Sequence, residues 1–398
     1  MASILNDPRL ARFFAERFET PLFPSVTVAA LSSDLTCSMD KDTAFAMGGK
    51  MNEVAQEVAF IHWLERVYQG PPAASGTTNL TFLPLCLYAN ATTKQERAAH
   101  NSTGQDASPS TTVVTTTFIG SWHRLGSIPL TKAVSRVLLQ ADSHECFYPA
   151  PHPMLYPPTG STLRRCRALI VDKTYAGSTQ DVVVPYTALD FHRLTTDALN
   201  TSSADPRPTL LFGCARHKFY GPFGGLRKRI FDVLSKLKLA PLVDVGAHRT
   251  PEACRAGFYR SKYCLVLPGD TASTASSTRA MLAGCVPVFV VDDWRDLPFA
   301  PLLNYSAFSL RLHERDVTCA GCALRLVERL NASRHGSAAY PQLAAGTAAA
   351  ADFFDYAHAE GPRSPYGAAL ASIVLDIASA HVPAGRAFRE LESGTLRT

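Results

Sequence analysis

The stretch "CLVLPGDTASTASSTRAMLAGCVPVFVVDDW", residues 264–294, decides the fold class of this chain. An apolar run ends in a Gly-Asp-Thr turn, and small and hydroxyl residues follow it. A short helical pattern then leads into a second apolar run, which ends in two aspartates. Two apolar runs joined through a helix indicate a βα unit of a parallel sheet.

The same alternation extends on both sides of this stretch, from about residue 205. The pattern predicts strands over residues 209–215, 240–246, 263–268, 286–293 and 305–312, and helices over 224–238, 250–261, 273–284 and 316–333. Because the strands are apolar throughout, we expect helices on both faces of the sheet. Ligands bind such sheets outside the carboxyl ends of the strands. The turns at 213–225, 244–249, 267–274 and 290–294 should therefore lie on one rim.

The remaining chain predicts a second, less regular domain. Strands are expected over 25–31, 112–122, 168–175 and 181–186, with a helix over 51–69 and a Ser/Thr/Asn-rich surface loop over about 71–112. The amphipathic pattern at 364–382 predicts a last helix that straps the two domains together. We therefore predict an N-terminal domain over 1–200, a C-terminal domain over 205–380 and a tail over 381–398.

Composition narrows the class of protein. The net charge of +5 is mild, and no basic run interleaves with aromatic residues, so nucleic acid is not an expected partner. Six of the eight asparagines lie in N-x-[ST] triplets, which favours a glycosylated, lumenal or extracellular protein. The ten cysteines lack the paired knuckles of a zinc site, and we expect buried thiols and a few disulfides. The N-terminal residues are too charged for a signal peptide, so we expect any targeting segment to precede them.

The turn between the two apolar runs is the main candidate site. Gly269 allows a sharp turn, and Asp270, Thr271, Ser273 and Thr274 follow it at the expected start of a helix. Free amides and the positive end of a helix dipole form an anion site, to which hydroxyl groups add donors. The same residue types also serve as ordinary helix caps. The residues alone leave phosphate binding and plain capping equally open.

This region resembles the C-terminal signature of the exostosin-like glycosyltransferases. The signature runs S-x-F-C-L-x-P-x-G-D-T-x-S-S, then G-C-I-P-V-x-x-x-D-D, then L-P-F and D-Y-S-x-F. The matching positions are Ser261, Cys264, Pro268 to Thr271, Ser273, Gly284 to Val288, Asp292, Asp293, Leu297 to Phe299 and Tyr305 to Phe308. The resemblance is close over about 205–312 and fainter over 165–200.

The resemblance implies an α/β protein of the GT-B fold, with two Rossmann-like domains. It implies an inverting hexosyl- or pentosyltransferase that takes a sugar from a nucleotide sugar, usually uridine-linked, to a polysaccharide or glycoprotein glycan. It also implies a Golgi lumenal, type II membrane protein of cell-wall or proteoglycan synthesis, whose anchor is absent here. A hetero-oligomer with another glycosyltransferase stays open.

Two arginines fit the role of stabilising the leaving diphosphate. Arg216 follows an expected strand, and Arg227 lies in a basic helix start that matches the family. The family has an arginine where Ser276 stands and an acidic residue where Arg279 stands, a position that commonly holds the ribose. Arg279 could reach the diphosphate from one helical turn away. These departures leave donor identity and activity open.

The general base and the metal question complete the predictions. Asp181, His248 and His123 are candidate bases on expected rim loops, each with a structural alternative. Asp292 and Asp293 leave a strand on opposite faces, so we expect a turn or cap role, no metal and no cofactor beyond the donor sugar nucleotide. The rival functions are a catalytically inactive glycan-binding or partner subunit and an unrelated nucleotide-binding enzyme.

Overall fold

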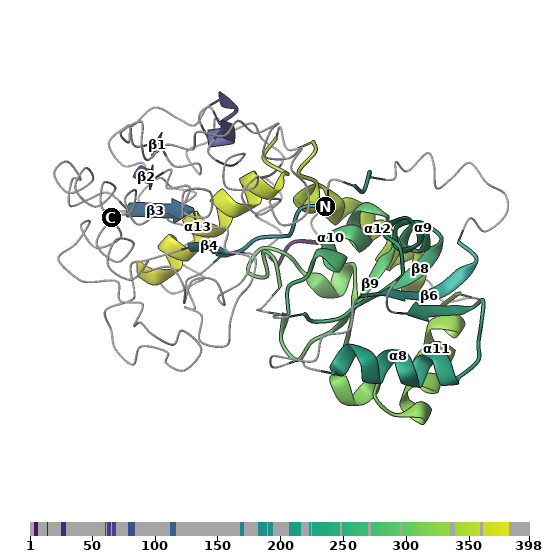
Figure 1. Ribbon diagram of the computed structural model, residues 1–398. Helices are drawn as coiled ribbons and strands as arrows, with labels where there is room; N and C mark the ends of the chain where they lie inside the picture. The colour runs from purple at the N-terminus through teal and green to yellow at the C-terminus, as the bar shows by residue number, and fades with distance from the viewer. Residues whose placement is uncertain are drawn as a thin grey trace, which may run out of the picture. The chain divides into compact units, whose positions relative to one another are not determined.

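Two parallel five-stranded sheets organise the chain in the computed structural model (Figure 1). Unit 1 comprises Met1–Ala11, Pro185–Ala359 and Arg363–Pro365, and unit 2 comprises Arg12–Val184, Glu360–Pro362 and Tyr366–Thr398. Each unit contains one of the sheets. The α/β class and the two domains predicted from the sequence, each built on a parallel sheet, are confirmed.

The structure describes the following residues: 4–6, 14, 25–28, 60, 62–64, 66–68, 79–83, 112–116, 168–170, 182–188, 190–193, 207–215, 223, 225–246, 249–269, 272–294, 297–334, 339–358 and 361–381.

Unit 1 contains the alternating βα pattern. Its strands are β6 (Thr209–Cys214), β7 (Val243–Gly246), β8 (Ser261–Val266), β9 (Val286–Val290) and β10 (Leu310–Leu312). Its helices are α8 (Leu226–Lys236), α9 (Pro251–Tyr259), α10 (Ala275–Leu282), α11 (Ala320–Arg334) and α12 (Ala339–Ala350), with short 3-10 helices η5 (Tyr305–Ala307), η6 (Glu314–Asp316) and η7 (Ala351–Phe354). The strands pair in parallel in the order β10-β9-β8-β6-β7. The chain order therefore reverses between β6 and β8.

Helices cover both faces of this sheet, as the apolar strands predict. Figure 1 shows α8 and α11 on one side of β6, β8 and β9, and α9, α10 and α12 on the other. On the first side, Leu226, Ile230 and Leu234 recur along α8 and are buried against the strands and α11. Burial of each such leucine or isoleucine contributes about 1.5–3 kcal/mol.

Two segments of unit 1 differ from the sequence-based expectations. Residues 305–312 were expected to form one strand, but Tyr305–Ala307 form η5 and only Leu310–Leu312 pair with β9. The Tyr305 hydroxyl donates to the Pro298 carbonyl at 2.6 Å, which ties this segment back to the preceding turn. Helix α12 was not predicted, because its alanine-rich sequence has little periodic contrast.

Unit 2 carries the second sheet, in the order β1-β2-β3-β4-β5. Its strands are β1 (Ser25–Val28), β2 (Asn79–Leu83), β3 (Thr112–Thr116), β4 (Ala168–Ile170) and β5 (Val182–Val183), all parallel. Strand β2 begins inside the Ser/Thr/Asn-rich segment of about 71–112, so the surface-loop prediction is wrong for residues 79–81; Phe82 and Leu83 belong to the apolar run that interrupts this segment. The sequon asparagine Asn79 pairs with Ser25 at the start of β2.

Helix α13 (Pro365–His381) is the predicted last helix, and from Tyr366 onward it belongs to unit 2. Tyr366 packs on the rings of Phe60 and Trp63, with centroids 5.7 and 5.8 Å apart. Phe60 and Trp63 lie within the helix predicted over 51–69 and are helical. The C-terminal helix thus returns the chain to helical residues of unit 2. Among the described residues, no helix combines the length and apolarity that a bilayer-spanning segment requires.

Candidate functional site

The candidate site lies at the carboxyl edge of the unit 1 sheet. All five strands are parallel, so the segments that follow β6, β7, β8 and β9 leave the sheet at the same edge. The reversal of chain order between β6 and β8 is the topological switch point, where α/β sheets bind their ligands. The turn that follows β8 contains Gly269, so the topology puts the predicted turn at this point.

The turn after β8 leads into a tightly packed helix. Pro268 and Gly269 end the extended segment, and Thr274 is the N-cap of α10 with extended backbone dihedrals. Ser273, Thr274, Ser276, Ser277 and Thr278 are all buried. Small side chains allow α10 to pack closely against its neighbours.

The caps of α9 and α10 use threonine in different ways. The Thr250 hydroxyl accepts the Ala253 amide at 3.2 Å, and Glu252 stands in the first turn of α9. Thr274 makes no such capping bond, and α10 has no acidic residue in its first turn. Thr274 is 7% exposed, and its buried hydroxyl has no hydrogen-bond partner among the described residues. A buried hydroxyl without a partner costs free energy.

Arg227 supports the same turn from the neighbouring helix. Its Nε donates to the Pro268 carbonyl at 2.9 Å and its Nη2 to the Leu267 carbonyl at 3.3 Å. The side chain is buried, and it comes from the first turn of α8, the helix after β6. A Cβ atom at Gly269 would lie 2.9 Å from the Arg227 Nη2, so the guanidinium packs directly on the glycine. Arg227 thus joins the two sides of the switch point.

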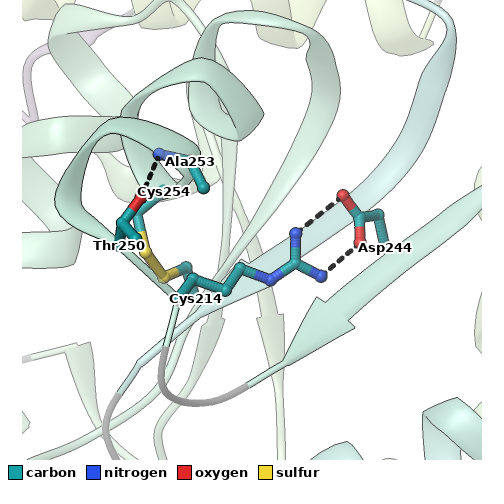
Figure 2. Close-up of a disulfide and its surroundings, with 6 residues drawn as sticks. Cys214, Asp244, Thr250, Ala253 and Cys254 are labelled. Carbon is teal, nitrogen blue, oxygen red and sulfur yellow. Dashed lines mark hydrogen bonds and ion pairs between the residues drawn. A yellow bond between two sulfur atoms is a disulfide. The ribbon is translucent and has the colours of Figure 1, made fainter.

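A disulfide and an ion pair brace the neighbouring segments at this edge (Figure 2). Cys214, the last residue of β6, is bonded to Cys254 in α9. Arg249 donates to the Asp244 carboxylate of β7 through both terminal nitrogens, at 3.0 Å for Nη1. These contacts fix the ends of β6 and β7 and the start of α9. A few disulfides were predicted, and the described cysteines form Cys214–Cys254, Cys264–Cys285 and Cys319–Cys322.

The two positions that depart from the family signature lie on α10. Ser276 is buried in the first turn of the helix. Arg279 is half-buried, and its guanidinium carbon lies 5.6 Å from the centre of the Phe191 ring. The Thr278 hydroxyl donates to the carbonyl of Tyr186 at 2.7 Å, five residues before Phe191. The contact of Arg279 is therefore with an aromatic ring, which favours an anchoring role over the suggested reach to a diphosphate.

Asp292 lies in the turn after β9, as expected for the adjacent aspartates. Its carboxylate meets the His313 Nδ1 at 3.1 Å, and its carbonyl accepts a bond from Arg311 at 3.3 Å. His313 follows β10 directly, so this pair is a polar feature of the carboxyl edge that sequence reasoning missed. Within the described residues, no three His, Cys, Asp or Glu side chains gather as a metal site would require. The expected independence of metal stays a prediction.

Tyr305 and Phe308 of the family's Y-S-x-F positions form an aromatic cluster with Phe289 and Trp294. Tyr305 packs on Phe289, Trp294 and Phe308, with ring centroids 4.9 to 5.5 Å apart. Burial raises the pKa of the Tyr305 phenol well above its usual value. The phenol therefore stays protonated and donates to the Pro298 carbonyl. These residues shape the loop after β9 and offer no ligand group.

Of the predicted site residues, Arg227, Gly269, Ser273, Thr274 and Arg279 are described. The structure brings Arg227, Gly269 and Thr274 together, because a Cβ atom at Gly269 would also lie 3.6 Å from the Thr274 methyl carbon. The other predicted residues lie outside the described part of the chain: Arg216, Asp270 and Thr271 of the phosphate site, and the candidate bases Asp181, His248 and His123.

Comparisons with known proteins bear on the family. Residues 149–327 match the model of the exostosin GT47 domain. A probable arabinosyltransferase of Arabidopsis thaliana, ARAD1, is 26% identical over 156 residues, which are 39% of this chain and 33% of that protein. The match thus spans about a third of the curated relative. The resemblance to the exostosin-like family is confirmed.

Two solved glycosyltransferases show weak structural similarity. The pneumococcal O-GlcNAc transferase GtfA, solved with UDP and GlcNAc, is 10% identical, with 70% of this chain and 54% of that chain covered and a TM-score of 0.31. The glycosyltransferase of kitacinnamycin is 12% identical, with 75% and 73% covered and a TM-score of 0.23. Scores this low say nothing about substrate or mechanism.

Proposed function

We propose that this chain transfers a sugar from a UDP-sugar to a glycan, with inversion, because residues 149–327 match the model of the exostosin GT47 domain. The observation that supports the donor site is the unpartnered hydroxyl of Thr274 at the start of α10. It stands at the switch point of the sheet, beside Gly269 and the buried guanidinium of Arg227.

The chemistry asks this site to hold a developing negative charge. An acceptor hydroxyl attacks the anomeric carbon, and the bond to the diphosphate breaks with its electron pair left on oxygen. Preorganised amides, hydroxyls and cations stabilise that charge. The α10 N-terminus supplies amides and the positive end of its dipole, and Thr274 supplies a hydroxyl donor. Arg227 donates hydrogen bonds to the Leu267 and Pro268 carbonyls, so it holds the turn and places a positive charge next to it.

The sugar and the compartment are further parts of the proposal. Because one relative is named a probable arabinosyltransferase, UDP-arabinose is the first donor to test. We propose that the chain acts on a glycan acceptor in the lumen of the Golgi. The six sequons and the three described disulfides support a location in the lumen of the secretory pathway. An endoglycosidase mobility shift of the protein from its native host checks this compartment.

Calorimetry with UDP, without and with a divalent cation, tests the donor site. Thr274→Val keeps the shape of the side chain and removes only the hydroxyl. We expect UDP affinity to fall about tenfold, because a hydrogen bond to a charged group contributes about 1.5 kcal/mol or more. Folding stability should not fall, since the hydroxyl has no partner among the described residues.

Thr250→Val is the matched control on α9. It removes a hydroxyl that caps its own helix, so we expect a loss of about 1 kcal/mol in stability and unchanged UDP affinity. The reverse pattern, in which Thr274→Val costs stability and leaves UDP affinity unchanged, would make Thr274 an ordinary cap. If the intact protein does not bind UDP, the departures at Ser276 and Arg279 favour the inactive glycan-binding or partner subunit.

A further inference from the structure

The start of α11 carries a cysteine pair that the proposed donor site does not use. Cys319 and Cys322 form a C-x-x-C pair and are joined by a disulfide. Cys319 is exposed and Cys322 is half-buried. Helix α11 runs for 15 residues from Ala320, so the pair stands at the N-terminus of a long helix.

Cys319 occupies the capping position of this helix. Its carbonyl accepts the first helical bond from the Ala323 amide at 2.9 Å. Its sulfur accepts the Cys322 amide at 3.0 Å, as an oxygen of a capping side chain would. The first turn of α11 has no acidic residue. A negative sulfur at this position is favoured by the helix amides and dipole.

Arg325 places a cation beside the second sulfur. Its Nη2 lies 3.5 Å from the Cys322 sulfur. A Cβ atom at Gly321 would lie 3.5 Å from the Arg325 Nη1, so the guanidinium also covers the residue between the cysteines. Each sulfur therefore has its own group to stabilise a thiolate: amides for Cys319 and a guanidinium for Cys322.

The other described disulfides are less exposed: Cys214 and Cys254 are half-buried. Cys264 and Cys285 are fully buried, and they join β8 to the residue that precedes β9. Their sequence separation is 21 residues, that of Cys214–Cys254 is 40, and that of Cys319–Cys322 is 3. Short loops give the least stabilisation of the folded state. The Cys319–Cys322 bond is thus accessible and contributes little to folding.

We propose that Cys319 and Cys322 form a redox-active site that exchanges its disulfide with small thiols of the glutathione class. The thiolate of the small thiol attacks the exposed Cys319 sulfur, and the protein S–S bond breaks with its electron pair left on Cys322 beside Arg325. A second small thiol then attacks the sulfur of the first small thiol in the mixed disulfide, and Cys319 leaves as a thiolate. Two thiols are oxidised to one small disulfide while the protein disulfide is reduced to two thiols. The proposal does not depend on sugar transfer.

The test is equilibration of the full chain in glutathione buffers of increasing reducing strength. Differential alkylation with mass spectrometry then measures the redox state of each cysteine, and circular dichroism follows the fold. We expect Cys319 and Cys322 to be reduced while Cys264 and Cys285 stay oxidised and the fold is intact. Reduction of Cys319 and Cys322 only together with Cys264 and Cys285, or only on unfolding, would overturn the proposal.

Two substitutions and a control substitution test the assigned roles in the same assay. In Cys322→Ser the Cys319 thiolate should attack the oxidised glutathione of the buffer, keep one glutathione as a mixed disulfide and release the other, and the absence of this adduct would contradict exchange at that sulfur. Arg325→Gln should slow reduction about threefold to tenfold, because the leaving thiolate loses its cation. Arg329→Gln removes the same charge one turn farther along α11 and should leave the rate unchanged. Equal effects of the two arginine substitutions would overturn the role of Arg325.

Discussion

At the scale of single residues, the buried guanidinium of Arg227 holds the shape of the candidate donor site. Its Nη2 and Nε donate to the consecutive Leu267 and Pro268 carbonyls after β8, 40 and 41 residues along the chain. Buried carbonyls that lose their donors cost free energy. The arginine therefore positions the turn before it contributes any charge to a ligand.

We expect Arg227→Gln to lower the free energy of unfolding by about 2 kcal/mol, because the Leu267 and Pro268 carbonyls lose charged donors. UDP affinity should fall as well, since the turn loses its support. Denaturant unfolding and calorimetry measure the two effects. Lys228→Gln is the neighbouring control: its side chain is exposed, so stability should change by less than about 0.5 kcal/mol. Equal stabilities of the two variants would contradict the claim that Arg227 stabilises the turn.

Residue roles were predictable only in part. The order of residues around Gly269 indicates an anion site or a cap, because the same residue types serve both. The choice depends on whether the Thr274 hydroxyl has a partner in the folded chain. The His313–Asp292 pair was missed because its members follow neighbouring strands and lie 21 residues apart. No sequence period connects such residues.

At the scale of elements, η5 and the aromatic cluster around Tyr305 fix the segment between β9 and β10. Burial raises the pKa of Tyr305 above the value of 10.0 for an exposed phenol. Below about pH 10 both the folded and the unfolded phenol are protonated, so its contribution to stability is fully present. Above about pH 10 the unfolded phenol ionises while the folded one keeps its proton. The stability contribution is therefore lost as the pH rises.

We expect Tyr305→Phe to lower the free energy of unfolding by about 1 kcal/mol near neutral pH, because the Pro298 carbonyl loses its donor. The stability of the variant should fall less steeply than that of the parent above about pH 10. Urea unfolding of both proteins over an alkaline pH series measures the two slopes. Parallel slopes would mean that the folded phenol ionises as readily as the unfolded one.

The elements of unit 1 were more predictable than those of unit 2, for a physical reason. A strand such as β8 is buried along its whole length, so an apolar run between turn residues marks it. Strand β2 begins with Asn79 in a Ser/Thr/Asn-rich segment, and composition alone favoured a loop there. Helix α12 lacks the contrast between apolar and polar positions that marks an amphipathic helix.

At the scale of the whole molecule, each end of the chain belongs to the unit that is formed mainly by the opposite half of the sequence. Tyr366–Thr398 belong to unit 2, and Met1–Ala11 belong to unit 1. Leu5 forms an antiparallel bridge with Leu303, and the Asn6 side chain donates to the Ala300 and Pro301 carbonyls at 2.8 and 3.1 Å. A boundary drawn from sequence order alone would separate these residues from the unit that they stabilise.

Replacing Leu5 tests whether the N-terminal residues stabilise unit 1 or, as a division by sequence order would have it, unit 2. Leu5 is 3% exposed, so Leu5→Ala should lower the free energy of unfolding of unit 1 by about 2 kcal/mol or more. Leu324→Ala removes the same atoms from an exposed position and should change stability by less than about 0.5 kcal/mol. Hydrogen exchange should rise over residues 297–305, whose amides and carbonyls bond Ile4 and Asn6. If exchange rises instead among the strands β1 to β5, the N-terminal residues stabilise unit 2, and the assignment of Met1–Ala11 to unit 1 is wrong.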